Sequence, residues 1–153
     1  NLPFLVSPVG RLDFRTEGLL LLTNDGELAR RLMHPKFQVP RYYHVLISGE
    51  LTSGEEEKIR KGITLEDGPA NNVEIVFSNN VELGQSKGSW YHVTVREGRN
   101  RLVRRMFEAI DYKVVRLVRF GYGDLRLPQN LEAGAYRQLT SDEIKKLKHM
   151  VQL

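Results

Sequence analysis

The most restrictive feature of the sequence is a run of four leucines, Leu19–Leu22, inside the stretch GRLDFRTEGLLLLTNDG. Gly18 precedes the run, and the turn-forming residues Asn24–Gly26 follow it. A short apolar run between turn formers is typical of a buried strand, and this one is far too short to cross a bilayer. The run therefore predicts a short core strand, with the acid Asp13 in the loop that leads into it.

Hydrophobic periodicity predicts the remaining elements of one mixed domain over residues 1–153, a length that suffices to bury a core. Ser53 and Glu56 have the spacing of a capping box, and Gly62 is expected to close the helix that they begin. A polar connection over residues 80–88 is expected to be a hairpin loop. Helices are expected between Asn24 and Pro35, over 53–62 and 100–110, and from Ser141 onwards, and strands over 42–51, 73–79, 89–98 and 113–123.

The composition excludes several classes of protein. The chain has no cysteine and four scattered histidines, so it has neither a disulfide framework nor a thiol nucleophile, and we expect no metal site. The N-terminus lacks the basic segment and apolar run of a signal peptide. We therefore expect a soluble, cytoplasmic monomer without a membrane partner.

The positive charge is concentrated in one part of the chain. The net charge is +4, yet residues 96–126 contain eight arginines and one lysine against four acids. Within EGRNRLVRRMFEAI the apolar residues recur at helical spacing, while Arg101, Arg104 and Arg105 share an adjacent face. A turn at Gly98 and the helix N-terminus would suit a phosphate. The alternative is a solvated face with ion pairs to neighbouring acids; arginine without lysine favours recognition of a polyanion.

The segment RYYHV places two adjacent tyrosines, Tyr42 and Tyr43, on a predicted strand. Adjacent strand residues point to opposite faces, so one tyrosine joins the core and the other can stack on a base.

Asp13 has two interpretations. In isolation a turn carboxylate paired with Arg11 or Arg15 is favoured, because Asp is common in turns. The alternative is a nucleophile or acid/base group kept ionised by a guanidinium. A glycosidase-like pair with Glu17 lacks the aromatic residues that stack on sugars. A DNA-binding helix-turn-helix lacks a second helix before the basic one.

Three segments in order, GRLDFRTEGLLLLTNDGELARRLMHP, RYYHV and EGRNRLVRRMFEAI, resemble the pseudouridine synthases of the RsuA/RluB/RluE/RluF type. The later segment VVRLVRFGYGDLRLP is most similar to the RluB branch, which acts on large-subunit ribosomal RNA. The resemblance implies an α+β fold: a mostly antiparallel mixed sheet, flanking helices and a central active-site cleft.

The resemblance also implies residue roles. Asp13 matches the catalytic aspartate, Tyr43 the tyrosine that packs on the target uracil, Arg104 the arginine that pairs with the aspartate, and Leu117 a leucine of the base pocket. The other residues expected to bind substrate are Arg11, Arg99, Asn100, Arg101 and Arg105.

The implied activity is isomerisation of a specific uridine in ribosomal RNA, expected to be 23S, to pseudouridine without a cofactor. The aspartate attacks the ribose C1′ or the uracil C6, and the base rejoins through C5. The alternative is an RNA-binding ribosome assembly factor without catalytic activity. RNA binding alone does not require Asp13 in its Thr-x-Gly context.

The sequence departs from the family pattern in two places. Leu102 stands where the family has a polar residue, so a hydrogen bond from that position is lost. The chain also begins close to the Gly-Arg-Leu-Asp loop, without the Lys-Pro-x-Gly segment and the small S4-like domain of many members. We therefore expect an N-terminally incomplete catalytic domain.

Overall fold

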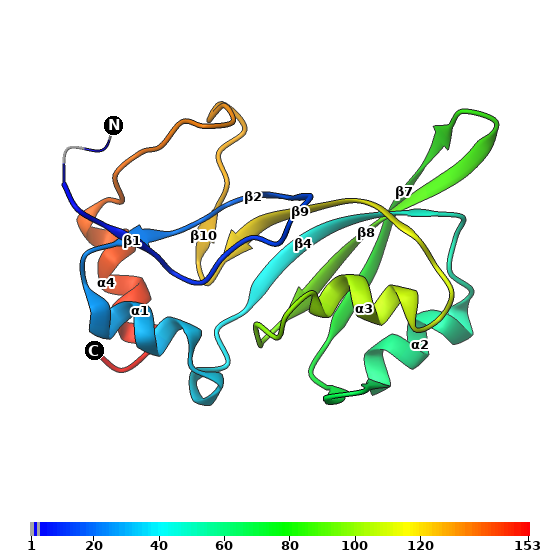
Figure 1. Ribbon diagram of the computed structural model, residues 1–153, viewed down its shortest axis with the longest axis horizontal. Coiled ribbons are helices and arrows are strands. Elements are labelled where there is room, and N and C mark those ends of the chain that lie inside the picture. The colour runs from blue at the N-terminus through cyan, green and yellow to red at the C-terminus, as the bar shows by residue number, and fades with distance from the viewer. Residues whose placement is uncertain (1, 3) are drawn as a thin grey trace.

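In a computed structural model, which describes residues 2 and 4–153, a long twisted sheet runs along the molecule (Figure 1). Five of its strands follow each other as antiparallel neighbours, and β2 joins β9 as a parallel partner. The expected mixed and mostly antiparallel sheet is therefore confirmed. In spatial order the strands are β10 (Leu125–Arg126), β9 (Val114–Tyr122), β4 (Arg41–Ser48), β8 (Ser86–Val95) and β7 (Glu74–Leu83), with β2 (Thr16–Gly18) beside β9.

Two short two-stranded sheets and the helices are the other elements of the described residues. The helices are α1 (Gly26–Met33), α2 (Ser53–Lys61), α3 (Leu102–Glu108) and α4 (Ser141–Met150), with a 3₁₀ turn at Pro35–Phe37. The short sheets pair β1 (Ser7–Pro8) with β3 (Leu22–Thr23) and β5 (Ile63–Leu65) with β6 (Gly68–Ala70).

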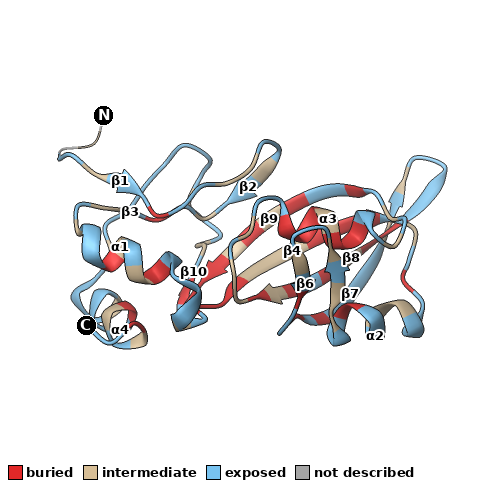
Figure 2. Ribbon diagram, turned by 60° about the horizontal axis from the view of Figure 1, so that its bottom comes forward, coloured by how far each residue is buried: buried red, intermediate tan, exposed pale blue. Residues whose placement is uncertain are grey.

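The hydrophobic core has two parts. One lies between the sheet and helices α2 and α3, where Val103, Met106 and Phe107 pack as their helical spacing predicts. The other joins α1 and α4 to the end of β9, around the buried ring of Tyr122. Figure 2 shows buried segments on the strands and on the inner faces of these helices.

The four-leucine run is not the buried strand that its composition predicts. Strand β2 ends at Gly18 and β3 begins at Leu22, so the run links two different strand pairings. The Leu19 N–H donates to the Arg119 carbonyl at 2.7 Å, whereas the Leu21 carbonyl accepts from the Val9 N–H at 2.8 Å. Because the segment changes partner midway, Leu21 is buried while Leu20 and Leu22 are 38% and 42% exposed.

The helix caps agree with the sequence at α1 and differ at α2. The Asp25 side chain, in the turn that the sequence places before this helix, accepts from the Leu28 N–H at 3.1 Å. The capping box of α2 uses Thr52 and Glu55, one residue before the predicted pair, because Thr52 has the extended backbone that a cap requires. Gly62 closes the helix with a φ of +105°.

The hairpin of β7 and β8 is longer than predicted. Residues 80–83 of the predicted loop belong to β7 and residues 86–88 belong to β8, so the chain reverses after Leu83. The outer half of the hairpin projects beyond the helices (Figure 1). Residues 76–83 of β7 and residues 86–87 of β8 are exposed or half-buried, so this part lacks the apolar alternation that identifies a strand in sequence.

Gly18→Ala is expected to destabilise the chain by about 1–3 kcal/mol, through overpacking and backbone strain. An added Cβ would lie 2.1 Å from the Arg119 carbonyl oxygen, at a φ of +117°. Urea unfolding measures the loss. Gly26→Ala is the control, since its Cβ meets nothing within 4 Å at the start of α1. Equal stability of the two variants would contradict a close β2–β9 contact.

Candidate active site

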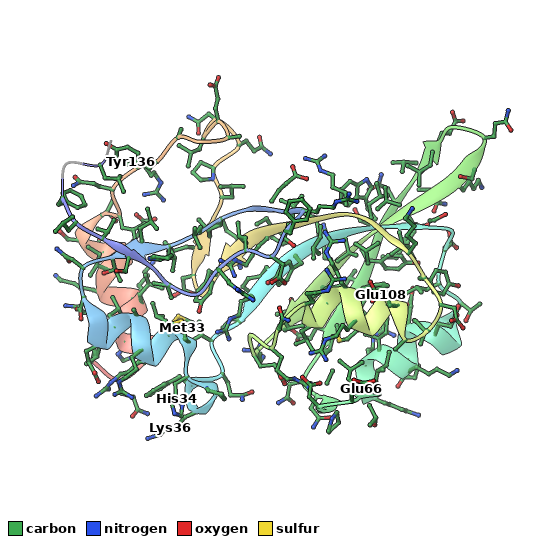
Figure 3. All side chains as sticks on the ribbon, in the orientation of Figure 1. Met33, His34, Lys36, Glu66, Glu108 and Tyr136 are labelled. Carbon is green, nitrogen blue, oxygen red and sulfur yellow. The ribbon has the colours of Figure 1, made fainter. Side chains whose placement is uncertain are left out.

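A cavity of about 530 Å³ lies on the helix-covered side of the sheet and is lined by residues of both core clusters. In Figure 3, Met33 marks its α1 side, and Glu108 marks the end of α3 that leads away from it. Seven of the nine predicted site residues line this cavity: Arg11, Asp13, Tyr43, Arg99, Asn100, Arg101 and Leu117. The other two, Arg104 and Arg105, are outside its lining.

Asp13 lies half-buried in the loop between β1 and β2. Its backbone carbonyl accepts from the Thr16 N–H at 2.8 Å, which closes the turn. Its carboxylate accepts instead from the backbone N–H of Arg101 at 3.2 Å, so it reaches across the cavity rim to the start of α3. No ion pair among the described residues joins the carboxylate to Arg11 or Arg15, so the interpretation as a paired turn carboxylate is not supported.

Arg104 lies behind this loop rather than on the cavity surface. It is 8% exposed, and its Nη2 donates to the Arg15 carbonyl at 2.9 Å. No ion pair within 4.0 Å joins Arg104 to Asp13 in the described part of the chain. Burial lowers the pKa of Arg104, Arg101 acts in the same direction, and the charge of Asp13 opposes them. The predicted pairing stays a prediction; the observed contact holds the Asp13 loop through its backbone.

Tyr43 and Leu117 project from neighbouring strands of the sheet. In the β4–β9 register Tyr43 lies opposite Arg119 and Val45 lies opposite Leu117, so both side chains reach the cavity on the same face. Tyr42 faces the other side, where the Arg126 guanidinium lies 4.0 Å from its ring centroid. The two adjacent tyrosines therefore point to opposite faces, as expected, but Tyr43 both packs against the core and lines the cavity, so the expected division into a core tyrosine and a stacking tyrosine is not observed.

The arginines around the start of α3 differ from the uniform basic face that the sequence predicts. Arg105 donates two hydrogen bonds to Asp67, at 2.9 and 3.0 Å, and Arg99 reaches the same carboxylate at 3.0 Å. Hydrogen bonding to Arg105 lowers the pKa of Asp67 below its usual range. Arg99 also pairs with Glu97. Arg99 and Arg105 thus link the β5–β6 turn to the start of α3. The spacing of residues within one helix cannot predict such a contact with a distant turn.

The turn into α3 is made by Arg101 rather than by Gly98. Arg101 is the N-cap residue and has a left-handed φ of +53°. Gly98 has no such conformation, and an added Cβ there would lie 3.6 Å from Arg41, an ordinary contact. The left-handed turn aims the Arg101 N–H at Asp13.

The predicted site residues leave out two buried arginines that line the cavity, Arg41 and Arg119, each 5% exposed. Arg41 precedes Tyr43 by two residues, and Arg119 follows Leu117 by two. Residues two apart on a strand point to the same face of the sheet. Once Tyr43 and Leu117 are placed in the site, this rule therefore predicts that Arg41 and Arg119 face it as well.

Within residues 2 and 4–153, no cluster of three His, Asp or Glu side chains could hold a metal ion. No helix in this described range is both long and apolar enough to cross a membrane.

Comparisons with known proteins agree on one family. Residues 1–109 match the family described as RNA pseudouridylate synthase. The chain is 46% identical over 145 residues to the ribosomal large subunit pseudouridine synthase B of Escherichia coli K12, covering 95% of this chain and 48% of that protein. The corresponding protein of Haemophilus influenzae is 45% identical, with 95% and 40% covered. The chain thus spans about half the length of these relatives or less.

Solved structures show the same fold. A crystal structure of a pseudouridylate synthase superposes with a TM-score of 0.81 at 35% identity, covering 93% of this chain and 59% of the other. The human RNA pseudouridylate synthase domain containing 1 superposes with a TM-score of 0.59 at 15% identity, covering 94% and 80%. The second likeness shows the fold alone.

Asp67→Asn is expected to strengthen binding of a single-stranded RNA by about twofold or more, because it frees Arg99 and Arg105 for phosphates. Fluorescence anisotropy at several salt concentrations measures the affinity. Asp111→Asn removes one exposed acid elsewhere and serves as the control. Equal changes in both variants would show that only the net charge matters.

Proposed function

Because this chain belongs to the RNA pseudouridylate synthase family, we propose that it converts a specific uridine of large-subunit ribosomal RNA to pseudouridine. The observation that carries the proposal is the position of Asp13. Its carboxylate lies at the wall of a cavity that also presents an aromatic and an aliphatic side chain, Tyr43 and Leu117. Such a cavity, of about 530 Å³, is large enough for a nucleoside.

The reaction is an isomerisation: the bond from the ribose to the base shifts from N1 to C5, and the atomic composition of the nucleotide stays the same. The N1–C1′ glycosidic bond breaks, the detached uracil rotates, and a C5–C1′ bond forms before the C5 proton is transferred to solvent and N1 gains one. Asp13 supplies the nucleophile, which attacks the ribose C1′ or the uracil C6. Among the described residues the carboxylate accepts one hydrogen bond, from the Arg101 N–H to Oδ2, which orients it and leaves Oδ1 available for attack.

The substrate base must leave its stack to reach this carboxylate. Tyr43 packs on one face of the extruded uracil, and Leu117 lines the pocket that receives it. Both side chains are carried by long paired strands, so the base is held on a rigid surface while the Asp13 loop approaches it.

The arginines divide into two groups in this mechanism. Arg104 acts as a positioning residue, because it is buried and donates to the Arg15 carbonyl in the Asp13 loop. Arg11, Arg99 and Arg101 line the cavity, and Arg105 lies outside its lining on α3; together they hold the RNA backbone. When RNA binds, Arg99 and Arg105 exchange Asp67 for phosphate.

Asp13→Asn is expected to abolish pseudouridine formation while leaving RNA affinity within about threefold, because the amide lacks the nucleophilic oxygen. Incubation of the chain with ribosomal RNA, followed by carbodiimide treatment and primer extension, maps the product. Asp111→Asn is the matched control and keeps full activity. Full activity of Asp13→Asn would refute the proposal. If the unsubstituted chain forms no pseudouridine, and both variants support ribosome assembly as well as it does, the chain is an RNA-binding module without catalytic activity.

Arg104→Ala is expected to lower turnover by about 100-fold or more with little loss of RNA affinity, since the Asp13 loop loses its anchor. Arg105→Ala, at a half-buried position outside the cavity lining, is expected mainly to weaken binding. Single-turnover rates and dissociation constants separate the two effects. Equal losses of affinity in both variants would contradict this division.

A further inference from the structure

The described chain buries three arginines, and none of its acids is classed as buried. Arg41 and Arg119 are 5% exposed and Arg104 is 8% exposed. A buried charge without a partner is costly, so proteins retain one where it meets an opposite charge. Arg41 and Arg119 line the cavity, which makes the ligand of the cavity the natural partner.

Arg41 is held by acceptors of the protein itself. Its Nη1 donates to the Val39 carbonyl at 2.8 Å, and its Nη2 reaches the Leu32 carbonyl at 3.3 Å and the Tyr122 hydroxyl at 3.1 Å. The Tyr122 hydroxyl donates to the same Leu32 carbonyl at 3.1 Å. This network fixes Arg41 and the ring of Tyr122 as a rigid wall.

Arg119 lies against this wall with unused hydrogen-bonding capacity. Its Nε donates to the Leu19 carbonyl at 3.0 Å, while its buried Nη2 has no hydrogen-bond partner among the described residues. The guanidinium lies 5.2 Å from the Tyr122 ring centroid, and that of Arg41 lies 5.0 Å from it. Two positive charges therefore share one aromatic ring.

The acids that line the cavity do not neutralise this corner. They are Asp13, which accepts from the Arg101 N–H, and Glu97, which pairs with Arg99. No ion pair within the described chain includes Arg41 or Arg119. The corner accordingly has an excess of positive charge and an unfilled donor, which suits a bidentate oxyanion such as phosphate.

We propose that Arg119, backed by Tyr122 and Arg41, binds a phosphate of the nucleotide whose base lies against Tyr43 and Leu117. Leu117 and Arg119 are alternate residues of β9, so their Cα atoms are separated by about 6.6 Å. This is roughly the span between the base and a phosphate of one nucleotide. The identity of the base rests on the proposed function, whereas the anion site rests on the buried arginines.

The test compares uridine with uridine 5′-monophosphate and uridine 3′-monophosphate, titrated into the chain by calorimetry. We expect one monophosphate to bind at least about tenfold more tightly than uridine, as a charge-assisted bidentate contact provides. The two monophosphates distinguish the 5′ from the 3′ phosphate. Arg119→Gln removes the preference without changing the affinity for uridine, and Arg119→Lys restores part of it.

Arg116→Ala is the matched control: it removes an exposed arginine of the same strand, one that pairs with Glu17, and keeps the preference. Thermal melts check that each variant folds. Equal binding of the three compounds, no binding of any, or a preference that survives Arg119→Gln would overturn the proposal. A phosphate preference without isomerisation of ribosomal RNA would refute the proposed function and leave the anion site standing.

Discussion

The parallel pairing of β2 with β9 is the contact on which the site depends. It is three residues long, from Thr16 opposite Leu117 to Gly18 opposite Arg119, yet it fastens the Asp13 loop to the strand that carries the other side of the cavity. Gly18 allows the two backbones to approach where any side chain would collide with the Arg119 carbonyl. The Asp13 loop is thus fastened to the sheet by main-chain hydrogen bonds between two strands.

Local patterns predict the elements that bury a face, and they fail where a segment exchanges partners. The apolar spacing of α3 and the alternation of β4 are periodic, so both elements could be predicted from sequence. The leucine run could not, because its residues serve two pairings in succession. The polar outer part of the β7–β8 hairpin could not either, since residues 76–83 of β7 and residues 86–87 of β8 have no buried side chain that would produce an apolar alternation.

The same distinction separates the parts of the candidate site. Asp13, Tyr43 and Leu117 were named through motif resemblance, and the cavity brings them together. The contact of Arg105 with Asp67 joins residues 38 positions apart, so no helical spacing contains it. On one short helix, the buried Arg104 holds the Asp13 loop and the half-buried Arg105 binds the β5–β6 turn; composition alone presents both as a basic face.

The two core clusters have a consequence for the dynamics of the chain. Each cluster has its own helices, one with α2 and α3 and the other with α1 and α4, and the cavity is lined by residues of both. Regions with separate cores can open as separate cooperative units, and a ligand that contacts both raises the free energy of opening of each. Occupation of the cavity therefore links the hydrogen-exchange protection of α1 to that of α3, although the two helices belong to different cores.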